Sequence, residues 1–325
     1  MGRAEMDMRG AAIPLDLAWL GYKSTKFVPH ISVCICSFRR PEMLKRLLLK
    51  LNDQVTEDLF TYSIVVADYD EARSGSPVVA KMSSYCRVPI RYLIEPRRNV
   101  ALARNKAIEN AEGAFVALID DNELPGPTWL LTLYQALCEH RADGVLGAVK
   151  RHYDEIPPVW FLKSAVHFSK TNPTGTVVRW KESQTQNALL KRGMVVCDPM
   201  PFRPEFREGE EDHDFFRRKI EAGYRFIWSA DAVVSETITP ARWKRSNILR
   251  KAILQGSAAA RQTNCTALHI AASLIAVLLN LLLIPFALLF GQQYFMRLMV
   301  KICNHSGKLL TRVGLDPFQN ESNSN

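Results

Sequence analysis

Paired cysteine motifs are missing from this sequence, although it contains seven cysteines. No two of them have CxxC spacing, and no cysteines and histidines have the spacing of a zinc site. Cys34 and Cys36 alternate along one predicted strand, so they share a face as small apolar residues. These absences argue against a structural zinc site and a disulfide framework, and we expect reduced, cytosolic thiols.

An excess of positive charge is also missing from residues 1–240, although the whole chain carries a formal net charge of +9. These residues contain 32 basic and 31 acidic side chains, whereas residues 241–325 contain ten basic and two acidic ones. A nucleic-acid binder is disfavoured, because the composition of the body shows no basic face. Internal repeats are absent too, and the only low-complexity tract is the polar end NESNSN, which we expect to be disordered.

The basic C-terminal region contains one long run without charge, AASLIAVLLNLLLIPFALLF at residues 271–290. As a helix, this run is long enough to cross a hydrocarbon layer of about 30 Å, and its basic flanks suit anionic lipid headgroups. A buried core helix is the alternative. Asn280 and Pro285 favour a kinked, re-entrant or interfacial segment about as much as a clean span.

The N-terminus shows no secretory signal, because its short apolar run AAIPLDLAWL includes Asp16. We therefore expect a protein anchored at the cytoplasmic face of the plasma (inner) membrane through its C-terminal region. We divide the chain into an N-terminal extension (1–29), a catalytic domain (30–240) and a basic, apolar, membrane-associated region with a disordered end (241–325).

Strands and helices alternate along the first part of the catalytic domain. The hydrophobic periodicity predicts strands at 31–38, 62–68, 89–96 and 114–119, and helices at 41–53, 76–85 and 100–113. This order is typical of an α/β domain with a parallel sheet covered by helices. Ligands of such sheets bind at the carboxyl ends of the strands. Asp68, Asp120 and Asp121 follow strand ends and should face the same crevice.

Asp120, Asp121 and Glu123 place three acids within four residues at the end of a buried strand, where they repel one another. Such a cluster can cap the helix expected to start near Pro127, act as an acid or base, or hold a divalent metal. Mg²⁺ takes only one or two carboxylates and completes its shell with substrate phosphates. The metal reading therefore implies a phosphorylated substrate.

A second acidic cluster, Glu210, Glu211, Asp212 and Asp214, lies at the N-terminus of a predicted amphipathic helix. The helix dipole stabilises anions there, so plain capping is one explanation. The other is catalysis, because an aspartate beside a metal-bound leaving group is suited to deprotonate a hydroxyl. We expect His213, inside this cluster, to be a solvated helix residue.

Six motifs in order, from about residue 30 to residue 236, resemble those of GT-A, family 2 inverting glycosyltransferases, in particular bacterial exopolysaccharide enzymes of the succinoglycan glucosyltransferase type. They are CICSFRRPEML, VVADYD, NVALARNKAIENAEGAFVALIDDNE, VLGAVKRHYDEIPPVW, TQNALLKRG and GEEDHDFF. The resemblance implies a GT-A fold, which is Rossmann-like with a mostly parallel central sheet and flanking helices. It also implies binding of a nucleotide-sugar donor.

The resemblance implies roles on the donor side of the site for residues that match the motifs. Ser37, Phe38 and Arg39 would border the base, and Asp68 would hydrogen-bond the uracil or ribose. Arg104 would approach the nucleotide or diphosphate, since guanidinium groups bind phosphates well. Asp120 would contact the ribose. Asp121 would hold Mg²⁺ or Mn²⁺ bridging the diphosphate.

On the acceptor side, the resemblance implies that Asp212 is the base that activates the acceptor hydroxyl for in-line attack with inversion. Asn187, with its neighbours in TQNALL, and Glu211 would line the donor sugar or the acceptor side. Trp160 and Trp228 are candidates to stack on a sugar ring, or are ordinary core residues.

Three departures from the family pattern stand out. Asn122 replaces a third aspartate, and Ser235 in VSE stands where relatives often have a histidine that is a possible third metal ligand. The segment YDEARSGS after Asp68 is divergent, so Asp70 has no assigned role.

The sequence therefore predicts a membrane-attached, metal-dependent, inverting hexosyltransferase that uses a nucleotide-diphosphate sugar, most plausibly UDP-linked. Its acceptor would be an oligosaccharide or a lipid-linked saccharide, in exopolysaccharide or cell-surface glycan synthesis. The alternative is a non-catalytic GT-A scaffold that binds a nucleotide-sugar in a polysaccharide assembly complex. A nucleotidyltransferase is disfavoured, because SFRRPEM supplies no glycine for a phosphate loop after the first strand.

Overall fold

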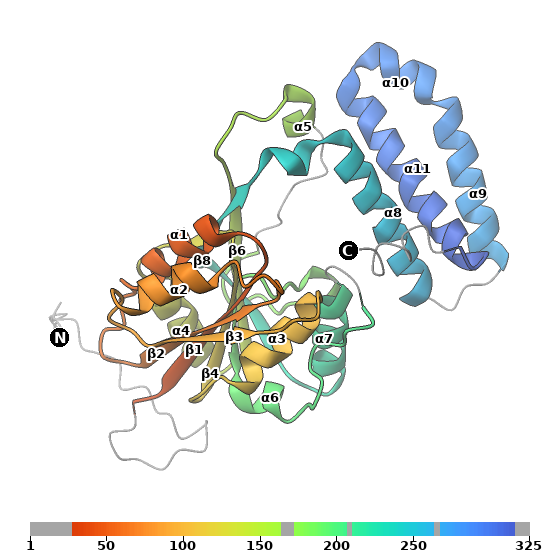
Figure 1. Ribbon diagram of the computed structural model, residues 1–325. Helices are drawn as coiled ribbons and strands as arrows, with labels where there is room; N and C mark the ends of the chain where they lie inside the picture. Colours follow the sequence, from red (N-terminus) through yellow and green to blue (C-terminus); the bar gives the residue numbers. More distant parts are fainter. Residues whose placement is uncertain (1–27, 164–171, 207–209, 263–266, 316–325) are drawn as a thin grey trace, which may run out of the picture.

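The computed structural model describes residues 28–163, 172–206, 210–262 and 267–315. Most of the predicted N-terminal extension and the polar C-terminal end lie outside these residues. The described chain forms an α/β body, from which a group of helices extends to one side (Figure 1). The element order alternates strands and helices up to residue 120, as the hydrophobic periodicity predicts.

The body is built on an eight-stranded sheet with the order β3-β2-β1-β4-β7-β6-β8-β5. Its strands are β1 (His30–Ser37), β2 (Thr61–Asp68), β3 (Ile90–Ile94), β4 (Phe115–Asp120), β5 (Glu123–Pro125), β6 (Gly144–Tyr153), β7 (Ala188–Lys191) and β8 (Phe226–Ile238). β1 to β4 are mutually parallel, as predicted. The other half is mixed, because β7 is antiparallel to β4 and β6, and β5 is antiparallel to β8.

Helices cover both faces of the sheet. On one face α1 (Pro41–Leu51), α2 (Ser76–Ser83) and α4 (Trp129–Glu139) pack on alternate side chains of β1, β2 and β4. On the other face lie α3 (Val100–Glu109), α6 (Arg192–Val196) and α7 (Glu210–Glu221). The predicted apolar stripe of α1 is confirmed, because its leucines at 44, 47, 48 and 51 are fully buried. Since both faces are covered, the strand ends are the route by which a ligand reaches the sheet.

A ribbon formed by β6 and β8 extends from the body toward the C-terminal helices (Figure 1). The chain then continues through η4 (Pro240–Trp243), α8 (Arg245–Gln262), α9 (Ala267–Leu282), α10 (Ile284–Phe290) and α11 (Gln292–Arg312). An apolar joint connects the body to these helices. Phe161 of α5 (Val159–Lys163) packs there with Tyr153 and Trp243, against Ile248 and Met296.

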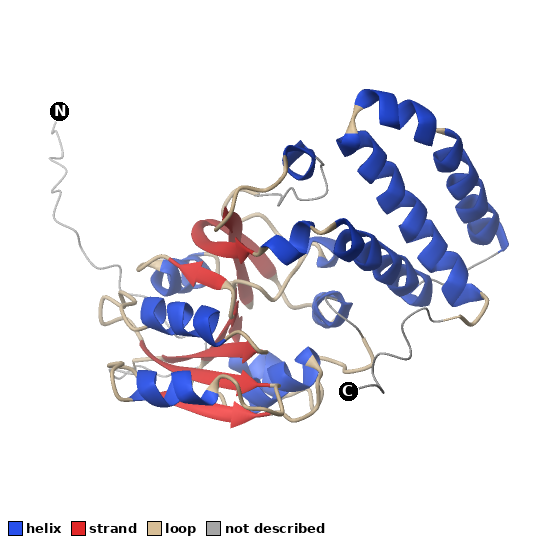
Figure 2. Cartoon of the chain, turned by 45° about the horizontal axis from the view of Figure 1, so that its top comes forward, coloured by secondary structure: helices blue, strands red, loops and turns tan. Residues whose placement is uncertain are grey.

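The C-terminal helices form one layer with α11 in the middle, between α8 and α9 (Figures 1 and 2). Two glycines allow α8 and α11 to approach closely. A Cβ on Gly256 would lie 1.9 Å from the carbonyl oxygen of Asn304, and one on Gly307 would lie 2.1 Å from that of Ile253. No larger residue fits at either point without separating the helices.

Within the described residues, no single helix is both long and apolar enough to span a bilayer. The helices α9 and α10 meet the length and composition requirements only as a pair, and they are bent by 48° at their junction. The predicted apolar segment, residues 271–290, is therefore helical but broken at Leu283, two residues before Pro285.

Candidate active site

The crevice at the carboxyl ends of β1, β2 and β4 brings the predicted donor residues together. Ser37 lies beside Asp68 in the sheet register, and Cys36 lies beside Asp120. Burial raises the pKa of the Cys36 thiol to about 12, Arg104 counteracts this rise, and the nearby aspartates add to it. The thiol is therefore neutral and packs among the acidic side chains, since the thiolate is disfavoured here.

Asp121 is held at the start of the crevice by two groups from the turn after β1. The Ser37 hydroxyl donates a hydrogen bond to Oδ2 at 3.0 Å, and Arg40 Nη1 donates to Oδ1 at 3.0 Å. Burial raises the pKa of Asp121, although Arg40 and Ser37 partly offset this effect. Arg40 was not among the predicted site residues, because a single arginine in a turn carries no signal of its partner.

Asp120 is surrounded by more negative than positive charge. Burial raises its pKa, Arg104 opposes this rise, and the charges of Asp212 and Asp121 add to it. Its backbone N–H donates to Glu123 Oε2 at 3.0 Å, while Glu123 Oε1 is buried without a hydrogen-bond partner. Arg104 and Arg40 therefore balance the charge of these carboxylates only in part.

Capping does not explain this first acidic cluster. Glu123 begins the short strand β5, and α4 starts only at Trp129, after Thr128, whose side chain makes no capping hydrogen bond. Glu123 lies opposite Glu236 of β8, and Ser235 lies opposite Leu124. The acids are therefore positioned by the sheet, not by a helix N-terminus.

Arg104 joins the second acidic cluster to the crevice. From α3, its Nη1 contacts Glu211 Oε1 at 3.2 Å and Asp212 Oδ1 at 2.8 Å. Asp212 Oδ2 accepts hydrogen bonds from the Thr185 hydroxyl at 2.8 Å and the Thr185 N–H at 3.1 Å. All three residues Arg104, Glu211 and Asp212 are buried. The predicted approach of Arg104 to a diphosphate remains a prediction, because its guanidinium is engaged by these carboxylates.

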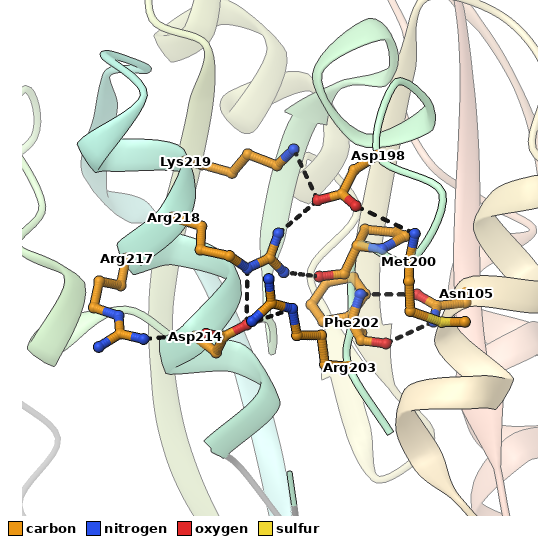
Figure 3. Close-up of polar contacts among 10 residues, drawn as sticks. Asn105, Asp198, Met200, Phe202, Arg203, Asp214, Arg217, Arg218 and Lys219 are labelled. Carbon is orange, nitrogen blue, oxygen red and sulfur yellow. Dashed lines mark hydrogen bonds and ion pairs between the residues drawn. The ribbon is translucent and has the colours of Figure 1, made fainter. Parts of the chain in front are cut away.

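Helix α7, which carries Asp212, is fixed to the preceding loop by a network of charges (Figure 3). Buried Asp214 contacts Arg203, Arg217 and Arg218, and Arg218 also reaches Asp198 at 2.6 Å. The same loop is attached to α3, because Asn105 exchanges hydrogen bonds with the backbone of Phe202. Asp214 therefore positions α7, whereas Asp212 points toward Arg104.

An aromatic platform lies at the outer end of β1. Phe38 stacks on Tyr69 with ring centroids 4.9 Å apart and an interplanar angle of 22°. The guanidinium groups of Arg39 and Arg98 lie 5.1 and 4.8 Å from the Phe38 ring centroid. Arg39 also forms an ion pair with Asp70 at 3.1 Å. Asp70, which had no assigned role, therefore lies next to the aromatic platform. A half-exposed ring with cationic neighbours is suited to bind a flat, anionic ligand.

Two predicted binding residues use their polar groups within the protein. The carboxylate of Asp68 is fully buried and accepts hydrogen bonds from the N–H groups of Asp70 and Gly75 and from Tyr92. Both amide hydrogens of Asn187 are donated to the backbone carbonyls of Ala148 and Ala232, and its oxygen accepts from Trp129. These contacts hold the β2–α2 loop and the edge of β7.

The neighbour of Asn187, Gln186, reaches the crevice instead, because its Nε2 lies 3.4 Å from Asp120 Oδ2. Gln186 and Thr185 belong to the motif TQNALL, whose residues next to Asn187 were predicted to line the donor sugar or the acceptor side. Trp160 lies in the joint with the C-terminal helices, and Trp228 is buried in the core. Trp180 of η3 (Trp180–Glu182) faces His213. His213, expected to be solvated, is half-buried there, and burial lowers its pKa.

Within the described part of the chain, no three His, Cys, Asp or Glu side chains form a ready-made metal site. The donor chemistry nevertheless fits Mg²⁺ or Mn²⁺. Asp120 and Asp121 supply hard oxygen donors, and such ions need only one or two carboxylates when substrate phosphates complete the shell. Burial raises the pKa values of both aspartates, and one buried oxygen of Glu123 has no hydrogen-bond partner, so a cation bound near Asp120 would stabilise these carboxylates.

Some known proteins are similar to this chain in sequence, and others are similar in fold. The succinoglycan biosynthesis protein ExoM of Rhizobium meliloti is 30% identical over 210 residues, which cover 64% of this chain and 67% of ExoM. The glycosyltransferase AglE of Haloferax volcanii is 26% identical over 216 residues, which cover 64% of this chain and 67% of AglE.

Among solved structures, the mannosyltransferase PcManGT from Pyrobaculum calidifontis, in complex with GDP-Man and Mn²⁺, has a TM-score of 0.58 and 19% sequence identity. The similarity covers 90% of this chain and 92% of that chain. TarS 1–349 of S. aureus has a TM-score of 0.50 and 14% identity, covering 88% of this chain and 92% of that chain. Similarity at these identities establishes the fold.

The sequence family described as Glycosyl transferase family 2 matches residues 32–203. That range includes the turn after β1, the acids after β4 and the strand β7. The chain therefore belongs to glycosyl transferase family 2 and is a glycosyltransferase with a GT-A-like α/β fold.

Proposed function

We propose that this enzyme transfers a hexose, with inversion, from a nucleotide-diphosphate sugar to a lipid-linked saccharide at the cytoplasmic face of the membrane. The observation that carries the proposal is the meeting of two acidic clusters in one crevice. Asp120 and Asp121 come from β4, Asp212 comes from α7, and Arg104 lies between them. The sequence similarity to ExoM supports a place in exopolysaccharide synthesis.

The aromatic platform suits the base of the donor. The half-exposed ring of Phe38 is supported by Tyr69, and Arg39 and Arg98 offer cations near it. Asp68 supports this wall through the backbone of the β2–α2 loop. We propose a uridine donor, with Asp120 near its ribose.

Asp121, with Asp120 nearby, would hold a divalent cation together with the donor diphosphate. When bound, this ion would stabilise the negative charge that grows on the departing nucleoside diphosphate. Arg40 lies close enough to Asp121 to hold this carboxylate in place through its own charge. The binding of GDP-Man and Mn²⁺ by PcManGT, which shares this fold, is consistent with the proposal.

Asp212 would take the proton from the attacking hydroxyl. Its carboxylate is held as an acceptor by Arg104 and Thr185, so its orientation is set before a substrate arrives. Glu211 shares the same arginine and fixes its position. As Asp212 takes the proton, the acceptor oxygen would bond to the anomeric carbon on one face of the sugar. The bond from that carbon to the diphosphate would break on the opposite face, and the nucleoside diphosphate would leave with the electron pair, which gives inversion.

The test is donor binding and turnover with a panel of nucleotide-sugars, with and without Mn²⁺ or Mg²⁺. Asp121→Ala should lose metal-dependent donor binding. Asp212→Asn should retain donor binding but lose about 10²- to 10⁴-fold in transfer rate. The control Asp58→Asn makes the same chemical change at an exposed site and should leave both unchanged.

Binding of a nucleotide-sugar by the wild type without any turnover would favour the scaffold alternative. The absence of binding to every nucleotide-sugar under every metal condition would reject the donor proposal. Product analysis by NMR reports the anomeric configuration. Retention of configuration would reject the role assigned to Asp212.

A further inference from the structure

Helices α9 and α10 expose an apolar surface with no cover from the rest of the described chain. We call this set of side chains the α9–α10 apolar face: Leu268, Ile270, Leu274, Ile275, Leu278, Leu279, Leu281, Leu282, Leu283, Phe286, Leu288, Leu289 and Phe290. Their exposed fractions range from 37% at Ile270 to 82% at Leu289. Only small residues point inward, because the buried positions of these two helices are Ser273 and Ala287.

Such a surface requires an apolar partner, because soluble proteins rarely expose contiguous apolar patches of this kind. The charges beside it indicate which partner. Basic residues of α8 and α11, including Arg250, Lys251, Lys301 and Lys308, lie in the same layer of helices. The described residues of these four helices contain no acidic side chain. An apolar face beside basic side chains matches a bilayer that contains anionic lipids.

Helix α9 alone is too short to cross the bilayer. Its 16 residues extend about 24 Å at 1.5 Å per residue, less than the roughly 30 Å of the hydrocarbon layer. The two helices meet the length requirement for a crossing only together, with α10 bent from α9 by 48°. Asn280 is compatible with apolar surroundings, since its amide donates to the Ala276 carbonyl of its own helix.

The position of α11 is the stronger argument. It packs along α9 in the opposite direction, and the Ser273 hydroxyl contacts His305 Nδ1 at 3.3 Å (Figure 2). Four residues along each helix from this contact, Lys301 lies level with Val277, near the middle of the α9–α10 pair. If α9 crossed the bilayer, Lys301 would lie near the midplane, at a cost of about 2.5 kcal/mol or more.

From the position of α11 against α9 we infer that the α9–α10 segment lies in the plane of one leaflet and does not cross the membrane. The α9–α10 apolar face enters the acyl region, and the basic residues of α11 contact anionic headgroups. Both ends of the segment then remain on the same side, next to α8 and the catalytic body. This inference specifies the membrane attachment included in the proposed function, but it needs no assumption about the sugar or the acceptor.

Flotation of the full-length protein with vesicles of phosphatidylcholine and phosphatidylglycerol tests the attachment. Leu278→Glu with Leu282→Glu should weaken the partition into vesicles about tenfold or more. The control Leu49→Glu changes an exposed leucine of α1 and should leave the partition unchanged. Vesicles of phosphatidylcholine alone should bind more weakly. Failure of the wild type to float, together with a dimer in sedimentation, would assign the face to a second copy of the chain.

Depth measurements separate the two modes of attachment. A fluorophore is placed on a cysteine at Leu268 or at Leu282, at opposite ends of α9, in a chain whose other reactive cysteines are replaced by serine. Lipids that carry a quencher at a known depth should report the same shallow depth for both positions. Clearly different depths would show that α9 crosses the bilayer and would overturn the inference. Neither readout depends on donor binding, so failure of the proposed chemistry is distinguishable.

Discussion

The catalytic body and the C-terminal helices distribute their side chains in opposite ways. The body buries its apolar residues in two clusters on the faces of the sheet, and it places charges in a covered crevice. The C-terminal helices put small residues at their contacts and leave leucines exposed. The body carries nearly balanced charge, whereas residues 241–325 have eight more basic than acidic side chains. One part buries its charged groups, and the other exposes its apolar ones, which suits the membrane attachment that we propose.

Removal of the central cation should give the largest change in the body. Arg104→Met leaves Glu211 and Asp212 buried without this partner. We expect the free energy of unfolding to fall by about 3–5 kcal/mol, because one partner of a buried charge pair is lost. Urea unfolding measures the difference. Arg46→Met, which disrupts an exposed pair with Asp154, should cost about 1 kcal/mol or less. Equal effects of the two variants would contradict the contrast.

Disruption of the small-residue contact should give the corresponding change in the C-terminal helices. Gly307→Ala places a methyl group against the Ile253 carbonyl oxygen and should destabilise the α8–α11 pair by about 1–3 kcal/mol. Hydrogen exchange should rise in α8 and α11 and remain unchanged in the sheet. Gly193→Ala is the control, because nothing lies within 4 Å of its added Cβ. Unchanged exchange in α8 would show that the helices do not depend on this contact.

Loss of the aromatic platform should weaken donor binding without affecting the fold. Phe38→Ala removes the ring that stacks on Tyr69, and stacking with a base contributes about 1–3 kcal/mol. We expect the Kd for UDP to rise about tenfold in calorimetry. Tyr85→Ala removes a side chain that is 70% exposed elsewhere and should not change the Kd. An unchanged Kd in the Phe38 variant would place the base elsewhere.

The smallest change concerns the pH dependence of stability. Burial, reinforced by Asp120 and Glu236, raises the pKa of Glu123 well above 4.5 in the folded protein. The folded state therefore holds this proton more tightly than the unfolded chain. Its contribution to stability is complete below pH 4.5 and is lost as the pH rises through the folded-state pKa.

Glu123→Gln should remove this contribution, so its stability should fall less than that of the wild type as the pH is raised. Unfolding curves at several pH values measure the difference. Glu57→Gln, at an exposed position, should follow the wild type. Parallel curves for the wild type and the Glu123 variant would show that the carboxyl is ionised throughout.

Local sequence patterns were sufficient for much of the body. The four parallel strands and the first helices follow from alternating apolar residues, and the position of Asp120 and Asp121 follows from the end of β4. The strand β5 was not predicted, because three residues that include two turn-like polar or proline positions carry no strand period. From the sequence, helix capping by these acids was one of three explanations. The pairing of β5 with β8 excludes it, because this pairing places Glu123 in the sheet.

Contacts between distant segments could not be predicted in the same way. Arg104 and Asp212 are separated by 108 positions, and Gln186 and Asp120 by 66. Asn187 resembled a binding residue by its motif, yet its amide hydrogens bond to backbone carbonyls of β6 and β8. A motif identifies a residue type that the fold requires, but it does not distinguish a ligand contact from an internal one.

In a chain attached as proposed, the close approach of α8 and α11 at Gly256 and Gly307 would limit how far the active site can move from the membrane. The backbones of α8 and α11 touch, and Phe161 connects these helices to the body. We therefore expect the C-terminal helices to be a rigid attachment and not a flexible one. This rigid attachment would keep the crevice at a fixed height above the lipid headgroups. Only acceptors whose terminal sugar lies at that distance from the lipid carrier would then reach the crevice. The enzyme would therefore select acceptors by length.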